Sequence, residues 1–170
     1  MALLDINGIT LANEWRDVES WNGEVSSDSI VVSFTDFKVH ASVIDTDSLS
    51  RLGVRLTVED DVQEISSYVQ SLGLIELVFA QFKDGRPFST AVKLRREQGF
   101  AGDLRASGDF IPDQVLFLIR CGFSSVVVPP QFDVKQVKAS LSAYTVAYQS
   151  AEDQKLSLVE QLRTSGSVSK

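Results

Sequence analysis

The chain has 170 residues, 44% of them hydrophobic, which fits one domain with a full core and excludes a second independent core. Its 16 basic and 23 acidic residues give a formal charge of -7, which argues against binding to nucleic acid or to an anionic membrane surface. The single cysteine, Cys121, excludes an intramolecular disulfide, and the longest apolar runs are too short to cross a bilayer. The first ten residues also lack the basic and long apolar stretches of an export signal, so we expect a cytoplasmic protein.

Residues 1–50 are predicted to form a small β-containing appendage. The pair Asn7 and Gly8 is typical of a tight turn, which predicts a β hairpin between Leu3 and Leu11. Residues 14–28 are polar and rich in turn formers. A short buried strand at 30–32 is then expected, followed by a brief helical turn near Asp36.

From Gly53 onward, strands and helices alternate regularly. The apolar runs predict strands at 54–57, 75–80, 103–107 and 125–128. Helical spacing, prolines and glycines predict helices at 60–71, from Pro87 to a stop at Gly99, at 112–121, and from Asp133 through Tyr148. Four strand-helix units demand right-handed crossovers, so the expected fold class is α/β with a mostly parallel sheet. The pattern leaves an open sheet and a partial barrel equally compatible.

This regular part, residues 51–150, is taken as the main α/β domain. Residues 151–170 form a separate C-terminal tail in this division, with helical spacing at Leu156, Val159 and Leu162. A docked or dimer-forming helix and a frayed extension both agree with that spacing. A homodimer therefore stays open as an assembly.

Candidate ligand residues follow the strands, because loops after the carboxyl ends of parallel strands gather at one edge of the sheet. Arg86 and Ser89 lie at a predicted helix start, where free N–H groups and the helix dipole attract anions. A local interpretation stands beside this one. Asp84 and Gly85 form an ordinary turn pair, Ser89 is a suitable helix cap, and an arginine at this place is commonly solvated.

Arg105 is unusual because it falls inside a strand that should be covered on both faces, where an unpaired guanidinium is costly. We expect a carboxylate partner, with Asp84 and Asp109 as the candidates. Either a structural ion pair or a ligand-facing arginine fits this pattern. Gly108, Asp109 and Gln114 lie in the turn and helix start that follow, and Gln114 is a candidate member of the same polar network.

Several catalytic motifs are missing from the sequence. His40 is the only histidine, so no multi-histidine metal site is expected. The chain contains no G-x-x-x-x-G-K-[ST] loop, no G-x-G-x-x-G fingerprint and no G-x-S-x-G elbow. No cofactor is therefore indicated by a motif, and its identity is left unknown.

Residues 84–123 resemble the signature block of a bacterial family, the domain-of-unknown-function 934 family. The shared pattern comprises Gly-Arg-x-x-Ser from Gly85, Leu-Arg-x-x-x-Gly from Leu94, Leu-Arg-Ala-x-Gly-Asp from Leu104, and the pair Asp113-Gln114. The resemblance covers roughly residues 50–150. It departs at Ser107 and at residues 110–112. The resemblance singles out Asp84, Gly85, Arg86, Ser89, Arg95, Arg105, Gly108, Asp109, Gln114 and Arg120, without assigning them catalytic roles. The candidate ligand residues among them are Asp84, Gly85, Arg86, Ser89, Arg105, Gly108, Asp109 and Gln114.

Members of that family are commonly encoded with sulfite reductase and other sulfur-assimilation proteins, and are often labelled probable oxidoreductases of sulfite reduction. The resemblance thus implies an accessory protein of assimilatory sulfite reduction that binds a small anion or the reductase. Two alternatives remain open: a cofactor-dependent oxidoreductase acting directly in sulfite reduction, and a structural assembly subunit.

Overall fold

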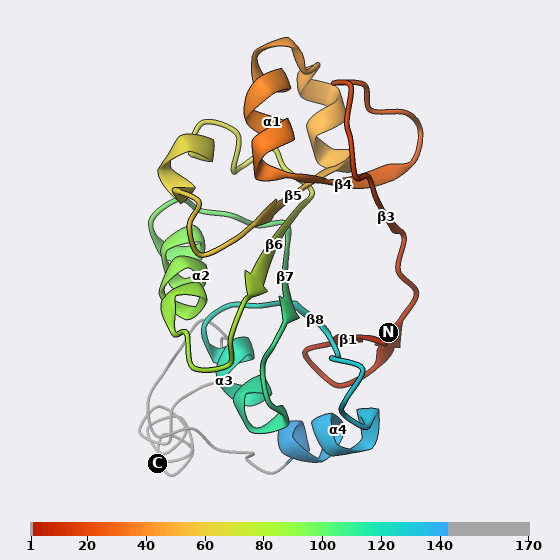
Figure 1. Cartoon of the computed structure of the whole chain (residues 1–170), viewed down its shortest axis with the longest axis vertical. Helices are drawn as coiled ribbons and strands as arrows, with labels where there is room; N and C mark the ends of the chain where they lie inside the picture. Colours follow the sequence, from red (N-terminus) through yellow and green to blue (C-terminus); the bar gives the residue numbers. More distant parts are fainter. Residues whose placement is uncertain (1, 143–170) are drawn as a thin grey trace, which may run out of the picture.

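The computed structural model describes residues 2–142, which build a curled sheet of eight strands with helices packed around its outside (Figure 1). Neighbouring strands follow the order β2-β1-β8-β7-β6-β5-β4-β3. All pairs from β3 to β8 are parallel, and β1 pairs antiparallel with both β2 and β8. The strands are β1 (Leu3–Asp5), β2 (Thr10–Leu11), β3 (Trp15–Asp17), β4 (Ser29–Ser33), β5 (Leu52–Leu56), β6 (Leu74–Phe79), β7 (Asp103–Gly108) and β8 (Ser125–Val127).

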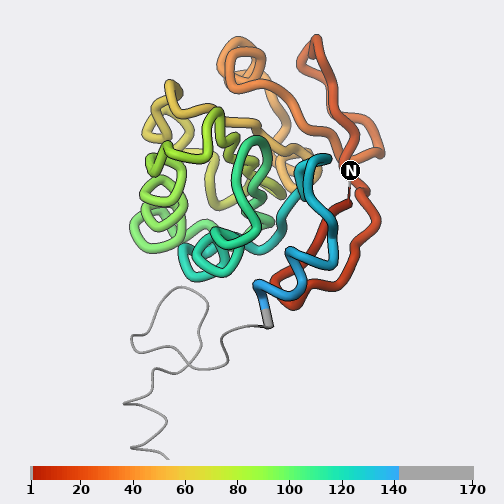
Figure 2. Tube along the Cα trace, turned by 60° about the horizontal axis from the view of Figure 1, so that its bottom comes forward, coloured from red at the N-terminus to blue at the C-terminus, as the bar shows by residue number. Residues whose placement is uncertain are grey.

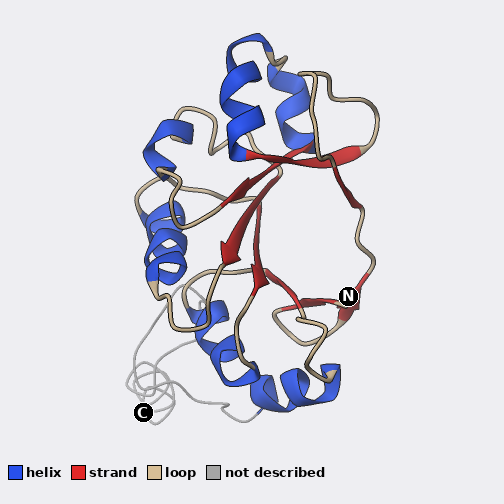
Figure 3. Cartoon of the chain, in the orientation of Figure 1, coloured by secondary structure: helices blue, strands red, loops and turns tan. Residues whose placement is uncertain are grey.

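The helices cover the convex face of this half-barrel, as Figure 3 shows in blue around the red strands. They are α1 (Phe34–His40), α2 (Arg86–Arg96), α3 (Val115–Arg120) and α4 (Val134–Ser142), with 3-10 helices at Ala41–Val43, Thr46–Arg51, Val62–Ile65 and Pro112–Gln114. Local sequence explains their limits. The Ser33 hydroxyl caps α1 by accepting from the Asp36 N–H, and Pro87 lies in the first turn of α2, where its missing N–H is not needed.

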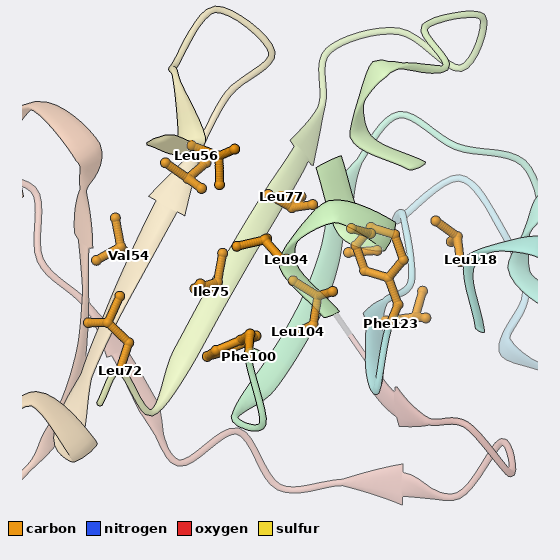
Figure 4. Close-up of a cluster of buried hydrophobic side chains, with 14 of the residues drawn as sticks. Val54, Leu56, Leu72, Ile75, Leu77, Leu94, Phe100, Leu104, Leu118 and Phe123 are labelled. Carbon is orange, nitrogen blue, oxygen red and sulfur yellow. The ribbon is translucent and has the colours of Figure 1, made fainter. Parts of the chain in front are cut away.

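The hydrophobic core lies between the convex face of the sheet and the helices. Side chains alternate along each strand, so Val54, Ile75, Leu77 and Leu104 point outward into this core and are fully buried or nearly so. Figure 4 shows them packed against Leu94 of α2, Leu118 of α3 and Phe123. The intervening residues of the same strands therefore point to the concave face.

The N-terminal segment crosses the open side of the curl. After the β1–β2 hairpin at one edge of the sheet, the chain runs to β3 at the other edge, as the right-hand side of Figure 3 shows. The hairpin turn lies beside α4 (Figure 2), where a Cβ placed on Gly8 would lie 3.3 Å from both Leu141 and Lys138. The first fifty residues thus supply four strands of the same sheet.

The mostly parallel sheet and the N-terminal hairpin predicted from the sequence are confirmed, and the sheet is a half-barrel rather than flat. The helix expected at 60–71 is wrong. Only Val62–Ile65 forms a 3-10 helix there, and turns follow it. The segment is rich in Ser, Asp and β-branched residues, which are weak helix formers, although its apolar residues Val62, Ile65, Val69 and Leu72 are buried at the expected spacing.

One further region differs from the expectation. The polar stretch 14–28 contains β3, which the sequence did not predict because it offers no apolar run. The predicted helix from Asp133 is present as α4, with the Asp133 carboxylate accepting from the Lys135 N–H at 2.9 Å. Its expected continuation through Tyr148 and the tail at Leu156–Leu162 lie outside the described residues. Within residues 2–142, no helix combines the length and the hydropathy needed to cross a membrane.

Candidate ligand-binding site

A row of polar side chains crosses the concave face of the sheet. In the strand register, Arg55 of β5 lies beside Glu76 of β6, Glu76 lies beside Arg105 of β7, and Arg105 lies beside Ser125 of β8. Each of these residues sits one position away from an outward-facing core residue, so the pleat turns it to the inside of the curl. Each of three successive strands contributes one charged residue, and together with Ser125 these residues form one continuous polar stripe.

Arg55 and Glu76 form the first ion pair of this stripe. The Arg55 Nε donates to Glu76 Oε1 at 2.9 Å, and its Nη2 donates to Glu76 Oε2 and to Asp17 of β3. Burial lowers the pKa of Arg55, but the hydrogen bonds and charges of Glu76 and Asp17 together outweigh burial and raise the pKa above its ordinary value. The Ser107 hydroxyl donates to Glu76 Oε1 at 2.6 Å, so this nearly buried carboxylate is well satisfied.

Arg105 forms the second ion pair and is only 3% exposed. Its Nη2 donates to Asp103 at 3.1 Å, its Nη1 donates to Asn13 at 3.1 Å, and its Nε lies 3.4 Å from the Ser125 hydroxyl. The expectation that Asp84 or Asp109 would be the partner is wrong. Asp103 takes that place because it lies two residues earlier on the same strand and therefore on the same face.

The stripe forms one wall of a cavity of about 880 Å³. The cavity extends from Asn13 and Trp15, near the amino ends of the strands, to Gly108 and Asp109, near their carboxyl ends. Its other lining side chains are largely apolar: Leu3, Val31, Val78, Val127, Pro129 and Pro130. A hollow of this size, apolar on most sides with a few convergent polar groups, has the character of a small-molecule site.

Gly108 shapes the lip of this cavity. It has φ of +94°, and a Cβ placed on it would lie 2.3 Å from the Phe79 carbonyl oxygen. Only glycine fits this position without moving backbone. The Asp109 N–H then donates to the same Phe79 oxygen at 2.7 Å, which fixes where β7 ends and where the Asp109 side chain starts.

The predicted site residues divide into separate groups. Arg105, Gly108 and Asp109 line the cavity, whereas Asp84, Gly85, Arg86 and Ser89 lie at the start of α2 and do not line it. The structure therefore does not bring Arg86 and Arg105 into a shared cavity. The ligand-binding assignment of the four residues at the start of α2 stays a prediction.

At the start of α2, Arg86 is engaged by carboxylates. Its Nη2 lies 2.7 Å from Asp84, and its Nη1 lies 3.3 Å from Glu59. Hydrogen bonds from the Arg86 side chain and backbone lower the pKa of Asp84, and the hydrogen bond to Asp84 raises the pKa of Arg86. Ser89 is exposed and does not cap α2, whose N-cap is Gly85.

Gln114 has a structural contact outside the cavity. Its Nε2 donates to the Phe82 carbonyl at 3.0 Å, and its Oε1 accepts from the Ile111 N–H at 3.1 Å. These bonds tie the loop after β6 to the segment that leads into α3. The Gln114 side chain thus holds together two loops that follow the carboxyl ends of β6 and β7, where the sequence had predicted them.

Sequence reasoning missed Arg55, Glu76, Asp17, Asn13 and Ser125. The available signal was a single charged residue inside each of the apolar strands at 52–56 and 74–79, the same signal that singled out Arg105. Among residues 2–142, His, Cys, Asp and Glu side chains form no group of three suited to a metal ion. The cavity is large enough for a cofactor or ligand of moderate size.

Comparison with known proteins gives one match. The model of a family described as bacterial protein of unknown function, DUF934, matches residues 53–159. The searches of curated proteins and of solved structures find no significant match. The matched region covers more than half of the chain and includes Arg55, Glu76, Arg105 and Asp109 of the cavity. The chain belongs to the DUF934 family of bacterial proteins of unknown function.

Proposed function

We propose that this chain is an accessory protein of assimilatory sulfite reduction that binds a small molecule in the cavity on the concave face of its sheet. The cavity of about 880 Å³ is the observation that carries the binding role. Small-molecule sites commonly measure roughly 300–1,000 Å³. The pathway rests on the resemblance described above, because relatives of that kind are encoded beside sulfite reductase.

The polar stripe supports binding of a ligand that has an anionic group. The Nη1 of Arg55 donates to no residue within 2–142, and the Arg55 side chain is 37% exposed. Its two N–H groups are therefore available on the wall of the cavity, where each can donate a charge-assisted hydrogen bond to a carboxylate or another oxyanion. Arg105 holds the neighbouring part of the wall rigid through its three partners.

Purification of the tagged full chain from its own cells tests the pathway. We expect sulfite reductase, or another protein of sulfur assimilation, to co-purify with it. The Arg55→Gln variant should keep the partner but lose ligand binding measured by calorimetry. The Arg51→Gln variant, which changes an exposed arginine just before β5, should behave as the wild type.

The cavity is also large enough for a cofactor, which agrees with the second candidate function, a cofactor-dependent oxidoreductase of sulfite reduction. An absorption spectrum of the protein purified from its own cells decides between the two. A band above 350 nm that disappears in the Arg55→Gln variant would favour the oxidoreductase. A chain that is colourless after separation from co-purified reductase would favour the accessory role, and a purification that recovers no reductase would count against it.

A further inference from the structure

Most charged groups of the cavity are already occupied within the protein. Glu76 accepts hydrogen bonds from Arg55 and Ser107, and Arg105 is held by three partners. Two groups of opposite sign remain open. Within the described part of the chain, neither the Nη1 of Arg55 nor the carboxylate of Asp109 has a hydrogen bond or an ion pair. A ligand can therefore reach one free cationic group and one free anionic group.

The charge balance of the lining disfavours a simple anion. The charged side chains that line the cavity are Arg55 and Arg105 against Asp17, Glu76 and Asp109. With two guanidiniums and three carboxylates, the wall carries a net charge of -1. An inorganic anion at Arg55 would be repelled by Glu76, whose charge is weakly screened because it is nearly buried, and to a smaller extent by the exposed Asp17 and Asp109. A ligand that also carries a cationic group offsets this repulsion.

The distance between the two open groups limits the ligand further. Arg55 lies on β5 and Asp109 follows β7, with β6 between them. Two strand spacings correspond to roughly 9.5 Å between the strand axes. Asp109 also lies four residues beyond Arg105, which shares a register row with Arg55, and this adds roughly 13 Å along the strands. Val78, at the carboxyl end of β6, lines the cavity and offers an apolar surface to the part of the ligand that spans this distance. The charges of the ligand should thus be separated by several bonds.

We propose that the cavity binds a small organic zwitterion, with its anionic group on the Nη1 of Arg55 and its ammonium group on the carboxylate of Asp109. This inference rests on the proposed function, because it assigns a ligand class to the same cavity. The oxyanion accepts a charge-assisted hydrogen bond from an N–H of Nη1, and the ammonium forms a charge-assisted hydrogen bond with Asp109. The methylene groups between them lie against the apolar wall.

A calorimetric series with the full chain at low salt tests the proposal. The zwitterionic probes are glycine, 4-aminobutyrate and 6-aminohexanoate, and the matched single-charge probes are hexanoate and hexylamine. We expect a longer zwitterion to bind at least tenfold more tightly than glycine and than either single-charge probe. Hexanoate or sulfite binding as tightly as the best zwitterion would overturn the proposal, and so would the absence of binding by every probe.

Paired variants locate the two charges. Asp109→Asn should weaken zwitterion binding about tenfold without weakening hexanoate binding, whereas Asp113→Asn, which changes an exposed carboxylate outside the cavity, should change neither. Arg55→Gln should weaken both probes, with Arg51→Gln as its control. If Arg55→Gln fails to fold, the Asp109 pair decides alone, and unchanged zwitterion binding in Asp109→Asn refutes the proposal.

The outcomes also separate this inference from the proposed function. Hexanoate or sulfite binding that is lost in Arg55→Gln would keep the cavity as a binding site and remove only the zwitterion. Co-purification of sulfite reductase is independent of both probes. Its failure would remove the accessory role, even if the zwitterion binds.

Discussion

Replacement of Gly108 by alanine tests whether the end of β7 is built as described. A left-handed backbone costs a non-glycine residue about 1–2 kcal/mol. The new methyl group would also lie 2.3 Å from the Phe79 carbonyl oxygen, which belongs to the adjacent strand and cannot rotate away. Relief of such an overlap by backbone movement typically costs about 1–3 kcal/mol. Together these terms predict a loss of about 3 kcal/mol in the free energy of unfolding.

Urea denaturation gives the free energy, and thermal denaturation should show a fall in Tm of about 6–12 °C for a domain of this size. Gly85→Ala is the matched control. Gly85 has a φ of -85° that alanine adopts readily, and a Cβ placed there meets no atom within 4 Å. Alanine is slightly less favourable than glycine at the N-cap of α2, but it also lowers the entropy of the unfolded chain, and the two effects offset each other. Equal stability of the two variants would refute the description of this turn.

Three further predictions concern charge and packing. The pKa of the Asp84 carboxyl, followed by NMR titration, should lie below the ordinary value of about 3.9 and return toward it in Arg86→Ala. Because this pKa is lowered on folding, Asp84 stabilises the fold above its unfolded pKa and loses that contribution as pH falls through the lowered value. Asp84→Asn should thus lower stability at pH 7 and match the wild type in strong acid, and parallel curves would contradict this. Glu76→Leu alone leaves Arg55 without its main partner and should cost about 3 kcal/mol, whereas the double variant with Arg55→Met should recover most of that loss; a double variant less stable than the single one would show that the pair has a net stabilising role. Phe79→Ala removes a ring that packs on Phe88, Phe110 and Phe123 and should cost about 3–5 kcal/mol in urea denaturation, with a loss below 1 kcal/mol arguing against this aromatic cluster.

The parallel sheet could be predicted because its strands are apolar and separated by helices with clear stops. Gly99 and Gly122 both adopt positive φ where the sequence placed the ends of helices. The strand Trp15–Asp17 could not be predicted in the same way. It is polar and three residues long, and it forms because β4 offers a free parallel edge at Ser29–Val31. Only the folded sheet creates that edge.

The candidate site shows the same division. Arg105 was recognised because a guanidinium inside a strand needs a partner, and the structure supplies one. Arg55 and Glu76 carry the same signal, a charged residue inside an apolar strand, but their pairing with each other appears only when β5, β6 and β7 align in register. Cross-strand neighbours are separated by about twenty to thirty residues, so no local pattern contains them. The start of α2 was favoured instead because its turn, proline and arginine form a local pattern.

The concave face itself argues for a ligand. In a closed barrel of eight parallel strands, large branched side chains fill the interior and leave no room. Here glycine and serine occupy inner positions at Gly53, Ser107 and Ser125, and the six parallel strands curl without closing on themselves. Ion pairs line that space, although well-packed apolar residues would stabilise such a wall at least as well. Arginines and carboxylates set on a rigid sheet around an unfilled volume are understandable if their use is recognition rather than stability.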